Sequence, residues 1–113
     1  MVTAEAALAL PVLVLVLAGA VAAVAVLGAQ VRCVDAAREG VLAAARGEDP
    51  ATVRSVVADT APAGAVVRID GPDGNRVAVT VTAEVSPLGA VPWSVRLSAS
   101  AVARPEPGQT GTP

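Results

Sequence analysis

The longest uncharged stretch of this chain constrains its fold more than any other feature. From Ala6 to Ala29 no residue carries a charge, and Ala, Val, Leu and Gly make up almost all of the run. As an α-helix it is about 36 Å long at about 1.5 Å per residue, which is enough to cross a hydrocarbon core of about 30 Å. A removable secretory signal has a basic start and a shorter apolar stretch. The sequence therefore predicts a membrane-spanning helix over residues 1–29.

Two residues stand out in this predicted helix. Glu5 is its acidic residue, and a carboxylate at bilayer depth costs several kcal/mol unless a cation pairs with it. Two interpretations remain open: Glu5 lies at the water interface, where it favours the positive end of the helix dipole, or it has a cationic partner. Pro11 removes a backbone hydrogen bond and crowds the preceding turn, so we expect a kink there. The Ala- and Gly-rich second half would let another helix approach closely.

Residues 30–47 predict an amphipathic continuation of the helix, closed by Gly47. Cys33 lies in this segment, and it is interpreted either as a small buried side chain or as a free thiol. The apolar stripe expected to face the rest of the protein has these members: Val31, Val34, Ala37, Val41, Leu42 and Ala45.

Residues 48–103 predict a small α+β domain. Asp49 and Pro50 are typical of a helix start and open a short second helix. Alternating apolar residues on both sides of Gly71–Asn75 predict a hairpin with a five-residue turn, and Trp93–Ala103 predicts a third strand. Small polar side chains are expected on the sheet face turned to water: Thr80, Thr82, Ser94, Ser98 and Ser100. Residues 104–113 predict a disordered tail. The predicted fold class is α+β, with a long N-terminal transmembrane helix, a short second helix and a three-stranded antiparallel sheet.

Composition excludes most enzymatic chemistry. The chain has no His and no Tyr, one Cys, and a net charge of −2. All of its basic residues are Arg. A catalytic triad, a Schiff base and an ordinary zinc site are therefore unavailable, and too few ligands gather near Asp70, Asp73 and Asn75 for calcium. We expect no catalytic residue, metal, cofactor or small-molecule substrate. Nucleic-acid binding lacks a basic patch.

Small residues with Glu at the fifth position, an unbroken apolar helix, a polar helical extension and a small α+β domain resemble type IV pilins and pseudopilins. The residues Val2–Ala7 (VTAEAA) and Gln30–Gly40 (QVRCVDAAREG) more closely resemble the TadE-like minor pilins of the tight-adherence (Flp) system. The resemblance covers residues 1–46 well and the remainder only in pattern.

The resemblance implies a role in assembling a pilus. A prepilin peptidase would cut a short basic leader after a Gly of the precursor. The sequence shows neither that leader nor that Gly, so either it is numbered as the mature chain, with Met1 as the processed N-terminus, or its start is placed too late. Glu5 would then pair with the N-terminal amine of a neighbouring pilin or pseudopilin subunit. The first helix would lie in the lipid bilayer of the cell membrane as a single pass, or within a surface pilus. The C-terminal domain would be extracytoplasmic.

One charge pattern opposes this topology. Arg32, Arg38 and Arg46 follow the apolar run, which by the positive-inside tendency places the domain in the cytoplasm, and the missing leader would supply the competing charge. Two other classes of protein stay open. One is a single-pass membrane anchor that presents a small binding domain and never polymerises, and the other is a membrane accessory subunit with a cytoplasmic domain.

Overall fold

Two helices and a three-stranded sheet make up the described part of the chain. The computed structural model describes residues 2–73, 76–89 and 91–104. Its elements, in chain order, are α1 (Val2–Ala45), α2 (Pro50–Thr60), β1 (Val66–Asp73), β2 (Arg76–Val85) and β3 (Val95–Ala103). This arrangement confirms the predicted α+β class with a long apolar N-terminal helix. Met1 and the tail predicted beyond residue 104 lie outside the described residues.

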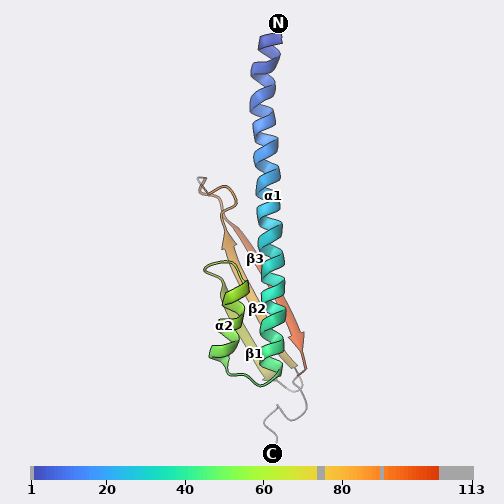
Figure 1. Ribbon diagram of the computed structural model, residues 1–113, viewed down its shortest axis with the longest axis vertical. Helices are drawn as coiled ribbons and strands as arrows, with labels where there is room; N and C mark the ends of the chain where they lie inside the picture. The colour runs from blue at the N-terminus through green and yellow to red at the C-terminus, as the bar shows by residue number, and fades with distance from the viewer. Residues whose placement is uncertain (1, 74–75, 90, 105–113) are drawn as a thin grey trace, which may run out of the picture.

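α1 runs unbroken through both predicted helical segments. Its N-terminal half projects away from the rest of the molecule, while its C-terminal half lies along the sheet (Figure 1). The molecule is accordingly elongated, with principal extents of 82 × 19 × 18 Å. Within the described residues, nothing covers the side chains from Thr3 to Leu17.

Local sequence signals determine where α1 ends and α2 begins. Gly47 has φ 85°, its N–H donates to the Ala44 carbonyl, and the N–H of Glu48 donates to the Ala43 carbonyl. This pair of bonds is the Schellman motif, which needs a left-handed residue and therefore favours Gly. The Asp49 carboxylate then accepts from the Thr52 N–H at 2.9 Å, with Pro50 in the first turn of α2. The predicted start of the second helix is confirmed.

The sheet has the order β1-β2-β3, and both pairings are antiparallel. α1 packs on β2 and β3, and α2 lies beside α1 on the same face near β1 (Figure 1). Alternate strand residues point into the core beneath the helices: Val77, Val79, Val81, Ala83, Leu97 and Ala99. On the opposite face Thr80 pairs with Ser100 and Thr82 with Ser98, so the predicted small polar face is confirmed for these four residues.

Two strand boundaries differ from the sequence-based predictions. β1 continues through Gly71 to Asp73, which pairs with Arg76 after an irregularity in register that begins at Asp70. The five-residue turn predicted for Gly71–Asn75 is therefore wrong, because a β-bulge accommodates one extra residue of β1 and the ladder then resumes. β3 begins at Val95 rather than at Trp93, since the residues before it form the loop after β2.

The buried face of α1 also differs in part from the predicted stripe. Ala37, Val41 and Ala45 are buried as expected, but Val31 and Leu42 are exposed. Small residues at alternating four- and three-residue spacing form one buried stripe along α1: Ala29, Cys33, Ala36, Gly40 and Ala43. Small side chains in this stripe let the helix lie close to the Val-rich strands, whereas Val31 and Leu42 turn outward.

Polar residues of α1 hold the C-terminal end of α2. The Arg32 guanidinium donates to the carbonyls of Thr60 and Ala61, both at 3.3 Å. The Thr60 hydroxyl donates to the Glu39 carboxylate at 2.9 Å. A cation at a helix C-terminus satisfies carbonyls that have no partner within the helix, so Arg32 and Glu39 fix α2 against α1.

Candidate functional site

The projecting part of α1 carries most of the exposed large apolar side chains of the described residues. From Thr3 to Val21 every side chain is exposed except that of Ala18, which is half-buried. Large apolar side chains cover the whole circumference of this segment: Leu8, Leu10, Val12, Leu13, Val14, Leu15, Val16, Leu17 and Val21. A helix that is apolar all round is unstable in water and needs lipid or other helices around it. Among the described residues, α1 is long and apolar enough to cross a membrane. This property is compatible with single-pass anchoring.

Glu5 lies in the first turn of this apolar segment and is exposed. Leu8, Ala9, Val12 and Leu13 follow it along one side of α1 and form with it a nearly flat, almost wholly apolar patch. Within residues 2–73, 76–89 and 91–104, no cationic side chain forms an ion pair with Glu5. The described chain thus places a single carboxylate at the edge of an apolar surface, and its predicted partner, an N-terminal amine, would come from another subunit.

The other residues singled out in the sequence lie apart from Glu5. Pro11 lies inside α1, which continues through it, and the kink stays a prediction. Cys33 lies fully buried in the core. Burial raises the pKa of the Cys33 thiol above its ordinary value of 9.0, and the positive charge of Arg32 opposes this shift. Met1, the predicted processed N-terminus, lies outside the described residues.

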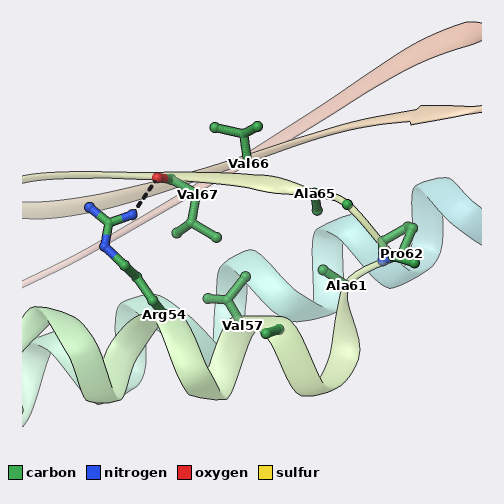
Figure 2. Close-up of a pocket in the computed structure, with 10 residues that line it drawn as sticks. Arg54, Val57, Ala61, Pro62, Ala65, Val66 and Val67 are labelled. Atoms are coloured by element: carbon green, nitrogen blue, oxygen red, sulfur yellow. Dashed lines mark hydrogen bonds between the residues drawn. The ribbon is translucent and has the colours of Figure 1, made fainter.

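A pocket of about 440 Å³ opens between the C-terminal end of α2 and the start of β1 (Figure 2). Its walls are mainly aliphatic and include Val57, Ala61 and Pro62. Arg54 is its charged residue, and its guanidinium donates to the Val67 carbonyl at 2.8 Å. No nucleophile or acid lines the pocket, and no metal-binding cluster of His, Cys, Asp or Glu occurs among the described residues. We therefore assign it no chemistry.

A second groove, of about 500 Å³, was not predicted from the sequence. The loop between β2 and β3 rises beside α1, and Leu88, Trp93 and Val95 face the stretch Gly19–Leu27 across this groove. Figure 1 shows the loop at the end of the sheet nearest the projecting part of α1. We call it the loop groove. The sequence signal for it is the uncharged run Val85–Val95, which contains the single Trp of the chain.

Comparison with known proteins agrees with this geometry. The family model described as TadE-like protein matches residues 1–42, which is nearly all of α1. The apoptosis inhibitor Rv3655c of Mycobacterium tuberculosis (strain ATCC 25618 / H37Rv) is 42% identical over 106 residues, covering 94% of this chain and 80% of that protein. No solved structure matches. Family membership suggests a membrane protein associated with the Tad pilus. This chain belongs to the TadE-like family.

Proposed function

We propose that this protein is a minor pilin or pseudopilin, a structural component that enters a type IV-like tight-adherence pilus through the N-terminal half of α1. The observation that supports this proposal most is the placement of Glu5. It is the one carboxylate on a helix surface that is otherwise apolar from Thr3 to Val21.

Glu5 supplies the register of assembly. A carboxylate and an ammonium each cost several kcal/mol when they enter hydrocarbon alone, and most of that cost is recovered when they pair. A subunit that slips along its neighbour separates the two charges and loses the compensation. The N-terminal amine of one subunit and Glu5 of the next therefore select a single axial offset between apolar helices whose packing alone would tolerate several.

Processing and topology follow from the same proposal. The prepilin peptidase would remove a leader and leave Met1 as the mature N-terminus, with its amine free to pair with Glu5 of the neighbouring subunit. The α+β domain would lie outside the cytoplasm. The charge pattern of Arg32, Arg38 and Arg46 opposes this topology, and a basic leader on the precursor would supply the competing charge. The role is structural and non-catalytic.

The decisive experiment replaces Glu5 with Ala or Gln in the native host. We expect the protein to remain in the membrane fraction and to disappear from sheared, purified pili. Glu84→Ala is the matched control, because Glu84 is an exposed acid on the sheet and away from the projecting helix. Normal incorporation of both Glu5 variants would contradict the pairing role.

The same experiment distinguishes a minor pilin from a single-pass membrane anchor. A single-pass anchor that never polymerises would be absent from pili already in the wild type, while remaining in the membrane. N-terminal sequencing of the membrane-bound protein adds an independent readout. A mature chain beginning at Met1 with a longer encoded precursor supports cleavage by the peptidase, whereas translation initiated at Met1 argues for the anchor.

A further inference from the structure

We propose that the tip of the β2–β3 loop, formed by Leu88, Val91 and Trp93, is a second membrane contact that sits in the headgroup region of the bilayer beside α1. This inference rests on the insertion of α1 that is part of the proposed function, and it does not depend on pilus assembly. Its consequence is that the domain is held at a fixed height and orientation on the membrane before any subunit is recruited.

The first argument is the height of the loop along α1. From Glu5, α1 rises about 21 Å to Gly19 and about 33 Å to Leu27 at about 1.5 Å per residue. With Glu5 at one interface of a hydrocarbon core of about 30 Å, the stretch Gly19–Leu27 straddles the opposite interface. The loop groove is lined by this same stretch of α1 together with Leu88 and Trp93. The loop tip therefore reaches the depth at which α1 leaves the bilayer.

The second argument is the chemistry of the loop. Trp93 is 48% exposed and Val91 is also exposed, so the tip presents apolar surface away from the core. Val85–Val95 carries no charge. The next residues toward the sheet are the exposed pair Glu84 and Arg96, whose carboxylate and guanidinium are 3.9 Å apart. The first charged side chains next to the loop therefore lie at its base, on the sheet face that points away from α1.

The third argument concerns which depth the loop backbone tolerates. The Gly89 N–H donates to the Ser86 carbonyl at 3.1 Å, and the Trp93 N–H donates to the Val91 carbonyl at 2.7 Å. These bonds satisfy part of the loop backbone, but an irregular loop in contact with lipid does not enter the hydrocarbon core. Trp is enriched at membrane–water interfaces, because its apolar ring packs against lipid while its N–H donates to water or to headgroups.

Contacts between β3 and α1 also fix the position of the loop relative to α1. The Gln30 side-chain amide donates to the Ser98 carbonyl at 3.3 Å, which ties β3 to α1. Leu97 and Ala99 on either side of Ser98 are buried in the core shared with α1. Because α1 and β3 are packed together over this length, insertion of α1 brings the loop to the membrane surface with it.

The single Trp of the chain makes the test direct. The full-length protein is reconstituted alone into phosphatidylcholine–phosphatidylglycerol vesicles, and Trp93 fluorescence is measured with lipids brominated at a shallow or a deep acyl position. We expect a blue-shifted emission that is quenched more by the shallow bromines than by the deep ones. The control is Trp93→Phe combined with Val102→Trp, because Val102 is exposed near the far end of β3. Its emission should be red-shifted and unquenched.

Equal quenching of Trp93 and of the position-102 reporter would overturn the proposal, provided that the protein resists alkaline extraction from the vesicles. Loss of that resistance would instead overturn the insertion of α1 itself. Leu88→Asp gives a second test, because a carboxylate at the tip should reduce the quenching of Trp93 by the shallow bromines. Val66→Asp, on the outer sheet face, should leave it unchanged. Protection of Trp93 from aqueous acrylamide without quenching by bromolipid would assign the loop to a protein contact and overturn the lipid assignment.

Discussion

A β-carbon added at Gly40 would lie 2.5 Å from the Cγ2 methyl of Val57 and 3.2 Å from the Cγ1 methyl of Val79. The glycine on α1 thus contacts α2 and β2 at once, at the point where the two helices and the sheet meet. Val57 and Val79 are both fully buried. A β-branched side chain has few alternative rotamers, so neither neighbour can easily move aside.

Gly40→Ala should therefore destabilise the domain, by about 1–3 kcal/mol, although Ala is the better helix former. Thermal or urea unfolding followed by circular dichroism in detergent micelles measures the effect. Gly28→Ala is the matched control, since it lies on the same helix with nothing within 4 Å of the added carbon. An equal or smaller effect at Gly40 than at Gly28 would contradict the packing described here.

Removing the Val57 methyl that would clash with a β-carbon at position 40 should restore part of the stability lost in Gly40→Ala. Val57→Ala alone opens a cavity and costs stability, but in combination with Gly40→Ala the two changes should be less than additive. A double-mutant cycle over the four proteins measures this coupling. Strict additivity would mean that the two residues do not compete for the same space.

Gly47→Ala should destabilise the end of α1 by about 1 kcal/mol, because the residue is held at φ 85°, where a β-carbon is strained. Gly47→Asn should cost less, since Asn tolerates the left-handed conformation. Hydrogen exchange of the Glu48 amide, which donates to Ala43, reports the integrity of this turn. The prediction fails if Ala and Asn are equally well tolerated.

The Asp49 N-cap of α2 should make the stability of the folded protein decrease at low pH. Hydrogen bonds from Thr52, from its side chain and from its backbone N–H, hold the pKa of the Asp49 carboxyl below its ordinary value of 3.8. Because the folded pKa is lowered, the stabilisation is complete above the ordinary value and is lost as pH falls through the lowered pKa. Melting temperatures measured from pH 7 down to about pH 2 follow this loss.

Asp49→Asn separates the cap from its charge. Asn is a good N-cap, so the variant should keep most of the helix stability at neutral pH while losing the part of the acid dependence that belongs to Asp49. Asp49→Ala should lose both. Glu48→Gln serves as the neighbouring control. If Asp49→Asn melts with an unchanged acid profile, the cap carboxylate is not the titrating group.

Cys33 should react slowly with maleimide in the folded protein, because its thiol is buried and its pKa is raised. Its labelling rate should increase as pH rises past 9.0 and should rise sharply in denaturant. The control is Leu42→Cys in a Cys33→Ala background, since Leu42 is exposed on the same helix. Equal labelling of the two positions by mass spectrometry in native conditions would place Cys33 outside the core.

Local chemistry in the sequence determined the elements of this protein. The uncharged run ending at Ala29 predicts a spanning helix because its length matches a bilayer, and Asp49 with Pro50 predicts the start of α2 because a cap needs only neighbouring residues. Alternation from Val77 to Val85 predicts β2 for the same reason. The prediction of Glu5 as a special residue also came from sequence, since a charge next to apolar residues can be seen without a structure.

Tertiary structure decided which surfaces those elements share. Periodicity placed Val31 and Leu42 inward, but packing buried Ala36 and Gly40 instead, because close approach to the sheet favours small side chains over large ones. The loop groove likewise depends on residues more than sixty positions apart in the chain, Gly19–Leu27 and Leu88 with Trp93. Such contacts are set by how α1 lies on β3, and no local pattern encodes that arrangement.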